Sequence, residues 1–349
     1  MEKIIQSTLA KSPEYYKDVI KLIEESLNYE AKYSFEKDFW PLINPNNHKN
    51  CHILIDKKSD KVVAHIGVKK RDIRVKRNKY PVILLGGIVT DKDYRGQGHF
   101  KNLFNDIIKH YEDKCAFYLL WSEKDYLYEK YSFFEFGTII QTGNQIFDEK
   151  KANELGFIKK EHTKLNEQEK IEVKELHDNN YKNYISFNRK ARDWYDVSQI
   201  KSTDLYIKHK DQERQKEVIA YFYVNKGQDL KDIIHEVSFF SDEDMIEKLS
   251  PFKLWLPEKH QSYIEHQHAL YIGLLRVGQK EKFTSFIQDV YSNDIFIKKM
   301  SDESVIFEFK DKEYNVTLKD FIQLTLGPKP AEEFVRYSPW IVISGLDSI

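Results

Sequence analysis

Apolar residues recur at helical spacing near the start of the chain. Over residues 13–28 they lie three or four positions apart, behind a Ser12-Pro13 pair that suits a helix start. Short apolar runs follow at 52–55 and 62–68, separated by a polar turn. The pattern predicts an amphipathic helix followed by a β-hairpin.

The next apolar run, residues 80–90, contains the pair Gly86-Gly87. Glycine inside a strand is typical of a bulge or of a close approach by another backbone or a ligand. Further elements are then predicted in the order helix from residue 100, strand 116–121, short helix 122–130 and strand 133–141. Helices and strands therefore alternate through the first ~145 residues, which is about the size of one domain.

The second part of the chain partly repeats this order. Residues 146–170 are rich in lysine and glutamate, so we expect a surface connection there. A helix at 168–181 and a helix start at 241–244 are predicted, with strands at 205–207, 218–224, 233–240 and 252–256. The chain contains no strict sequence repeat. We expect two domains, residues 1–145 and residues 146–349.

Composition excludes several classes of protein. Lys+Arg 55 nearly cancels Asp+Glu 56, so the net charge of -1 creates no field to attract nucleic acid or an anionic membrane. Two cysteines in 349 residues exclude a disulfide framework and fit a reducing compartment. The apolar run 82–89 is too short to span a bilayer. We expect a cytoplasmic protein with no nucleic-acid, membrane or metal partner, and the oligomeric state stays open.

A glycine-containing loop joins the strand at 80–90 to the helix that follows. Backbone N–H groups and the helix dipole at such a junction suit a diphosphate. Gly96 and Gly98 let a ligand come close, and Arg95 and Lys101 add positive charge. The alternative is a plain glycine turn, which is how most bare Gly-x-Gly matches are explained.

The segment 89–104 resembles the acetyl-CoA signature of the GNAT superfamily of N-acetyltransferases, usually Arg/Gln-x-x-Gly-x-Gly/Ala. Arg95 and Gly98 match its first two fixed positions, whereas Phe100 stands where glycine or alanine is usual. Bulky residues there also occur in the enhanced-intracellular-survival type, a tandem GNAT. The resemblance implies acetyl-CoA as co-substrate, with no metal, bound by Arg95, Gly96, Gln97, Gly98, His99, Phe100 and Lys101.

The same resemblance implies the fold: an α/β (α+β) GNAT fold with a mixed, mostly antiparallel sheet flanked by helices. In the tandem type the fold occurs twice. Residues 1–145 would then be the catalytic domain that binds acetyl-CoA. Residues 146–349 would be a degenerate GNAT-like domain that shapes the acceptor site and carries an apolar C-terminal tail.

A second motif, Tyr128-Glu129-Lys130-Tyr131-Ser132-Phe133, is similar to the family's Tyr-Glu-Lys-x-Gly-Phe, with Ser132 in place of glycine. The resemblance implies that Tyr128 protonates the departing thiolate, and the alternative is a core aromatic. It also implies that Ile88 and Val89 hold the pantetheine arm by main-chain hydrogen bonds. Ser122 occupies a position where the family often has a polar residue touching the cofactor, although a helix N-cap explains it equally well.

The last residues of the chain, 337–349, are apolar to the end. Burial of this tail would bring the carboxyl group of Ile349 into the interior. Enhanced-intracellular-survival acetyltransferases and N-myristoyltransferases use a C-terminal carboxylate in the active site. The resemblance implies the same for Ile349, as proton acceptor or as anchor for the substrate cation, and the alternative is a tail that closes the second core.

Together these features predict an acetyl-CoA-dependent N-acetyltransferase. The acetyl group would pass directly to a primary amine of a small molecule or a peptide, and holding both reactants in one cleft would supply much of the acceleration. Two alternatives stay open: transfer of another acyl group, such as a fatty acyl or aminoacyl unit, and an acetyl-CoA-binding protein without turnover.

Overall fold

The computed structural model describes residues 4–210, 217–240, 244–257, 267–328 and 340–349. The N-terminal elements are β1 Ile4–Thr8, α1 Tyr16–Ser26, α2 Phe35–Asp38, α3 Trp40–Ile43, β2 Cys51–Asp56, β3 Lys61–Val75, β4 Asn78–Thr90, α4 His99–Tyr111, β5 Phe117–Leu120, α5 Asp125–Glu129 and β6 Phe134–Thr142. The middle elements are α6 Glu149–Glu154, β7 Ile158–Lys160, α7 Glu167–Tyr181, β8 Ile185–Phe187, α8 Ala191–Ser198, β9 Asp204–Lys210, β10 Glu217–Val224, β11 Ile233–Phe239, α9 Asp244–Leu249 and β12 Lys253–Pro257. The last elements are β13 Gln267–Val277, α10 Lys280–Val290, β14 Ile295–Met300, β15 Ser304–Phe309, β16 Lys312–Thr317, α11 Leu318–Leu326 and β17 Ile341–Val342.

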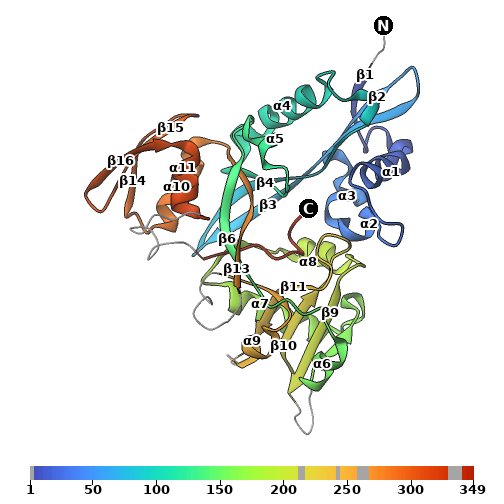
Figure 1. The fold of residues 1–349 in the computed structure, drawn as a ribbon, viewed down its shortest axis with the longest axis vertical. Coiled ribbons are helices and arrows are strands. Elements are labelled where there is room, and N and C mark those ends of the chain that lie inside the picture. The colour runs from blue at the N-terminus through green and yellow to red at the C-terminus, as the bar shows by residue number, and fades with distance from the viewer. Residues whose placement is uncertain (1–3, 211–216, 241–243, 258–266, 329–339) are drawn as a thin grey trace.

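One large mixed sheet connects the N-terminal part with the middle of the chain, and β14, β15 and β16 form a separate sheet (Figure 1). Within the described residues the large sheet has 14 strands, and twelve of them follow the order β1-β2-β3-β4-β5-β13-β6-β12-β11-β10-β9-β7. Most neighbours are antiparallel, while β4–β5, β11–β12 and β8–β17 are parallel pairs. The predicted fold class, a mostly antiparallel mixed sheet flanked by helices, is confirmed.

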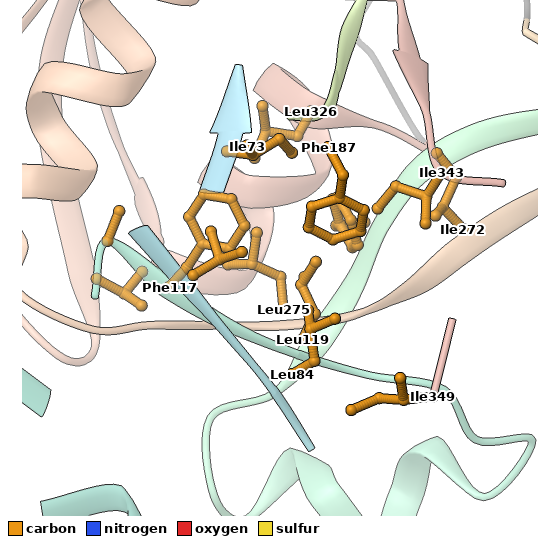
Figure 2. Close-up of a cluster of buried hydrophobic side chains, with 14 of the residues drawn as sticks. Ile73, Leu84, Phe117, Leu119, Phe187, Ile272, Leu275, Leu326, Ile343 and Ile349 are labelled. Carbon is orange, nitrogen blue, oxygen red and sulfur yellow. The ribbon is translucent and has the colours of Figure 1, made fainter. Parts of the chain in front are cut away.

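Helices cover both faces of the N-terminal part of this sheet. The apolar side of α4, including Leu103, Phe104 and Ile107, packs on one face. The opposite face is covered by α1, α10 and α11, whose buried side chains share one core cluster. Figure 2 shows part of this second cluster, in which Leu84 and Leu119 lie near Ile349.

The middle of the chain repeats the arrangement around α4. In the N-terminal part, β4 and β5 are parallel strands joined through α4. In the middle of the chain, β11 and β12 are parallel strands joined through α9. Parallel neighbours need such a crossover, because a hairpin cannot join them. The two halves are therefore built on the same strand–helix–strand unit.

Two features differ from the sequence-based expectation. Residues 146–170 are not only a surface connection, because they contain α6 and β7, and β7 pairs with β9 at the edge of the sheet. The strand β13 was not predicted. It comes from the last part of the chain and lies between β5 and β6, pairing with both.

Other predicted elements agree with the structure or lie outside its described part. The helix predicted from residue 13 and the hairpin after it correspond to α1, β2 and β3, although β3 extends to Val75. Residues 241–243 and 337–339, which belong to a predicted helix start and to the apolar tail, lie outside the described residues.

Candidate functional site

The strands β4 and β5 separate part-way along their length. They pair in parallel from Val82 opposite Phe117 to Leu85 opposite Leu120, where β5 ends. Beyond that point β4 continues to Thr90 with β3 as its neighbour. Within the described residues, no strand pairs with residues 86–90 on the side of β5. This main chain is therefore free to pair with an extended ligand.

A bulge lies at the start of this free segment. Gly67 faces Gly86 across β3 and β4, but His65 faces Val89, so the register shifts between the two pairs. Gly87 has a φ of 57°, a left-handed conformation that favours glycine. The predicted bulge at Gly86-Gly87 is present. It leaves Gly87 and Ile88 opposite a single residue of β3, Ile66, and Val89 pairs again with His65.

The loop after β4 leads directly into α4. Gly96 and Gly98 have φ angles of 75° and 81°, and a Cβ atom at either position would meet nothing within 4 Å. Gly98 is the N-cap of α4 and provides no side-chain cap, so the first N–H groups of the helix remain available. The loop is thus open to a ligand and presents unpaired donors.

The other loop residues shape this turn. Arg95 donates a hydrogen bond from Nε to the carbonyl oxygen of Thr90 at 3.1 Å, and Gln97 donates to the carbonyl oxygen of Asp93 at 3.1 Å. The Nε2 atom of His99 lies 3.3 Å from Oε1 of Gln97. The side chain of Lys101 is exposed at the start of α4.

The bulky Phe100 points into the core under α4. Its ring packs on Phe104 and Tyr131, with centroids 5.1 Å and 5.9 Å away. The side chain therefore stabilises the start of the helix through its contacts with the aromatic cluster. A small residue is not required at this position.

The motif around Tyr128 forms α5 and the turn after it. Tyr128 packs against Phe104 and Phe133 on the same face of the sheet as α4. Burial, with a smaller effect of Tyr131, raises the pKa of Tyr128 to about 12, so the phenol keeps its proton at neutral pH. Ser132 has a φ of 59°, which explains why glycine is usual there.

The hydroxyl of Ser122 has a local partner. Its Oγ accepts a hydrogen bond from the main-chain N–H of Lys124 at 3.0 Å, which stabilises the turn before α5. The carbonyl oxygen of Ser122 accepts a hydrogen bond from the hydroxyl of Tyr271 in β13. Ser122 therefore lies beside the end of β5 with its hydroxyl engaged in a turn.

The carboxyl end of Ile349 lies against the bulge, on the opposite face from Tyr128. A Cβ atom at Gly86 would lie 2.7 Å from both the carbonyl carbon and an oxygen of Ile349. The side chain of Ile349 is buried in the cluster that contains Leu84 and Leu119 (Figure 2). Tyr128 and Ile349, distant in the sequence, thus lie on opposite faces of the N-terminal part of the sheet.

Sequence reasoning missed His65, whose fully buried ring lies beside the bulge. Its Nδ1 lies 2.7 Å from the carbonyl oxygen of Gly87, and because a carbonyl only accepts, Nδ1 carries the proton. Burial lowers the pKa of His65 to about 4, against the opposing effect of that hydrogen bond. The sequence around His65 does not indicate this hydrogen bond, because the bond depends on the bulge opposite the histidine.

Asp38 was also missed. It is 1% exposed, and neither carboxylate oxygen has a hydrogen-bond partner within the described residues. Burial raises its pKa, although the hydroxyl of Ser202, the charge of Lys226 and the hydroxyl of Tyr29 oppose the shift. A Cβ atom at Gly227 would lie 1.8 Å from Oδ2 of Asp38. An unpaired buried carboxylate therefore lies on the face that holds Ile349.

A known protein family matches the part of the chain that contains the opening and the loop. Residues 10–137 match the family model described as an acetyltransferase (GNAT) domain. The N-terminal part of the chain is therefore similar to a GNAT acetyltransferase domain. The matched residues contain β4, the loop, α4, β5 and the motif of Tyr128. A comparison with curated proteins finds no match.

Solved structures with the same fold extend over nearly the whole chain. A protein of unknown function from Enterococcus faecalis, described as a probable N-acyltransferase, is 11% identical, with a TM-score of 0.62, and covers 99% of this chain and 95% of its own. GCN5-related N-acetyltransferases from Kribbella flavida and Anabaena variabilis are 12% and 11% identical, with TM-scores of 0.55 and 0.56. Each covers 90% of this chain, and 83% and 85% of its own length. At these identities the likeness concerns the fold, a GNAT acyltransferase fold.

Among the described residues, no group of three or more His, Cys, Asp or Glu side chains is arranged to hold a metal ion. None of the described helices combines the length and apolar character needed to cross a bilayer.

Proposed function

We propose that this protein transfers the acetyl group of acetyl-CoA to a primary amine. The observation that carries the proposal is the opening between β4 and β5 beyond Leu85 and Leu120, which adjoins the uncapped start of α4. A diphosphate at residues 95–101 would accept hydrogen bonds from the N–H groups of the loop and the first helical turn. The pantetheine arm would then pair with the main chain of Ile88 and Val89.

The two faces of the opening carry different chemistry. The neutral amine attacks the thioester carbonyl carbon, a C–N bond forms, and the C–S bond then breaks. Tyr128 donates its proton to the departing thiolate, and the raised pKa keeps that proton available at neutral pH. The proton lost by the amine passes to the carboxyl group of Ile349 on the other face.

The surroundings of the bulge favour a short acyl group. A Cβ atom at Gly86 would lie 3.1 Å from Leu42 as well as against Ile349. A Cβ atom at Gly87 would lie 3.1 Å from His65 and 3.2 Å from Phe35. Main chain and side chains thus crowd the bulge, which supports an acetyl group over a fatty acyl chain.

The acceptor face carries carboxyl groups beside a buried lysine, Lys226. Asp38 is buried without a hydrogen-bond partner in the described part of the chain, and Ile349 adds a carboxyl group nearby. A buried carboxylate gains most from a cationic or hydrogen-donating partner. These groups suit an amine acceptor, and residues 146–349 would shape its site beside the catalytic domain of residues 1–145.

The proposal is tested by measuring CoA release with acetyl-CoA, propionyl-CoA and myristoyl-CoA against a panel of primary amines. The expected result is turnover with acetyl-CoA, less with propionyl-CoA and none with myristoyl-CoA. A preference for the long chain would assign a different donor. Tight acetyl-CoA binding without release for any amine would instead support a non-catalytic acetyl-CoA-binding protein.

A further inference from the structure

The last residues of the chain are fixed by a buried group of charges. Asp347, two residues before Ile349, is 4% exposed. Arg189 donates to it from Nη2 at 2.8 Å and from Nε to both carboxylate oxygens at 3.2 Å. Arg71 donates from Nη2 to the other oxygen at 2.8 Å. Two guanidinium groups therefore hold one carboxylate from two directions.

Arg189 is itself held in place. Its Nη1 donates to Glu236 at 3.0 Å, and Glu236 also accepts a hydrogen bond from the hydroxyl of Tyr221 at 2.9 Å. The guanidinium lies over the ring of Trp194, 4.9 Å from its centroid. Glu236, Trp194 and Asp347 thus set the orientation of Arg189. A guanidinium group with a fixed orientation can hold a carboxylate in one geometry through paired hydrogen bonds.

The ion pairs keep Asp347 charged. Burial alone raises the pKa of Asp347, but the charges of Arg189 and Arg71 outweigh it and hold the pKa well below its usual range. A buried ionic group of this kind contributes little net stability compared with apolar side chains of the same size. Its clearest effect is to define one position of the chain.

A lysine fixes the residues on either side of Asp347. The Nζ of Lys226 donates to the carbonyl oxygen of Gly345 at 2.7 Å and to that of Ser348 at 2.6 Å. Lys226 is 1% exposed. Residues 345, 347 and 348 are therefore each held, and Ile349 follows directly at the bulge.

These anchoring residues come from separate parts of the chain. Arg71 lies in β3 of the N-terminal part, Arg189 precedes α8, and Glu236 lies in β11 of the second half. Figure 1 shows the C-terminus close to α8 and α3. The second half thus determines where the end of the chain lies in the opening of the first.

We propose that Arg189 is a positioning residue for acyl transfer: through Asp347 it places the carboxyl group of Ile349 against Gly86. This inference rests on the proposed role of Ile349 in acetyl transfer. Arg189 does not reach the reacting atoms itself. Its effect is on the location of the proton acceptor, and a displacement of 1 Å at a reacting group can reduce turnover by about 10²-fold.

The first test is a double-mutant cycle with Arg189→Lys, which keeps the positive charge but removes the paired hydrogen-bond donors of the guanidinium group. The second change adds two glycines after Ile349 and so moves the carboxyl group. Arg189→Lys is expected to lower kcat by more than about tenfold and to leave the Kd for acetyl-CoA unchanged; in the extended chain it should lower kcat no further. Equal losses in both backgrounds would overturn the proposal, since Arg189 would then act independently of Ile349.

The second test does not need activity. Digestion of the folded protein with a carboxypeptidase measures how often the end of the chain leaves its site. Arg189→Lys should release Ile349 faster, by about tenfold or more, at a temperature where circular dichroism shows the fold intact. An unchanged rate in a folded variant would overturn the proposal even if the protein had no transferase activity. Faster release in a protein without transferase activity would overturn the proposed function alone.

Arg192→Lys is the matched control for both tests. Arg192 lies in α8 near Arg189, stacks on Tyr195 and pairs with Asp196, and within the described residues it forms no hydrogen bond or ion pair with residues 345–349. Its side chain is 49% exposed. The same substitution there is expected to change neither kcat nor the rate at which Ile349 is released.

Discussion

The carbonyl carbon of Ile349 lies 2.7 Å from the point where a side chain on Gly86 would begin. Gly86 does not have a positive φ, so its backbone conformation does not require glycine. The requirement comes from the end of the chain, which occupies the space of the missing side chain. The C-terminus and the bulge of β4 therefore form one structure.

Gly86→Ala is the direct test of this relationship. The new methyl group would push Ile349 away, because the clashing atoms are main chain and cannot rotate aside. Turnover is expected to fall by about 10²-fold while the affinity for acetyl-CoA stays unchanged. Steady-state kinetics and calorimetry on the same preparation measure both quantities.

Gly67→Ala is its control. Gly67 faces Gly86 across β3 and β4, and its Cβ would meet the side chain of Leu42 at 2.8 Å instead of Ile349. Both substitutions overpack the core by one methyl group, so we expect similar losses of stability, of about 1–3 kcal/mol. Equal turnover in the two variants would show that the carbonyl end of Ile349 has no part in the reaction.

Tyr128→Phe removes the proposed acid and keeps the ring that packs on Phe104 and Phe133. A positioned general acid contributes about 10²–10⁴-fold, and kcat should fall by that order with little change in the Kd for acetyl-CoA. Tyr131→Phe, in the same aromatic cluster, is expected to keep near-normal turnover. Full activity of Tyr128→Phe across the pH range would exclude the assignment.

Stability should fall with acidification between pH 6.5 and 4. Burial lowers the pKa of four histidines to about 4, namely His52, His65, His162 and His235. Between these pH values the unfolded chain, with ordinary histidine pKa values near 6.5, binds more protons than the folded chain. The free energy of unfolding therefore rises with pH and decreases as the pH falls. Denaturant unfolding at several pH values measures the slope.

His52→Gln checks the origin of that slope. The Nε2 of His52 has no hydrogen-bond partner within the described residues, so the substitution removes one titrating group without breaking a hydrogen bond of that atom. The slope between pH 6 and 5 should decrease by about 1 kcal/mol per pH unit. An unchanged slope would mean that His52 has the same proton affinity in both states.

The local features of the site could be predicted from the sequence because neighbouring residues define them. The glycines of the loop, the bulge at Gly86-Gly87 and the start of α4 depend on a continuous stretch of chain. The long-range features could not. β13 lies between β5 and β6, and Arg71 reaches Asp347, although more than 100 residues separate the partners in each case.

The position of Ile349 shows the same division. The apolar tail predicted burial, but its place at Gly86 depends on Arg189 and Lys226, whose spacing along the chain carries no pattern. His65 and Asp38 were missed for a similar reason. The environment of His65 depends on the bulge at Gly87, and that of Asp38 depends on Gly227 in the second half of the chain.

The most direct test of the account is calorimetric titration with acetyl-CoA of three proteins: the wild type, Gly98→Trp and Gly156→Trp. Gly98 and the exposed Gly156 have similar φ angles of 81° and 85°, so both substitutions strain the backbone alike, but only the first fills the loop. The account predicts that the wild type and Gly156→Trp bind acetyl-CoA and that Gly98→Trp does not. Absence of binding by the wild type, or equal binding by Gly98→Trp, would contradict it.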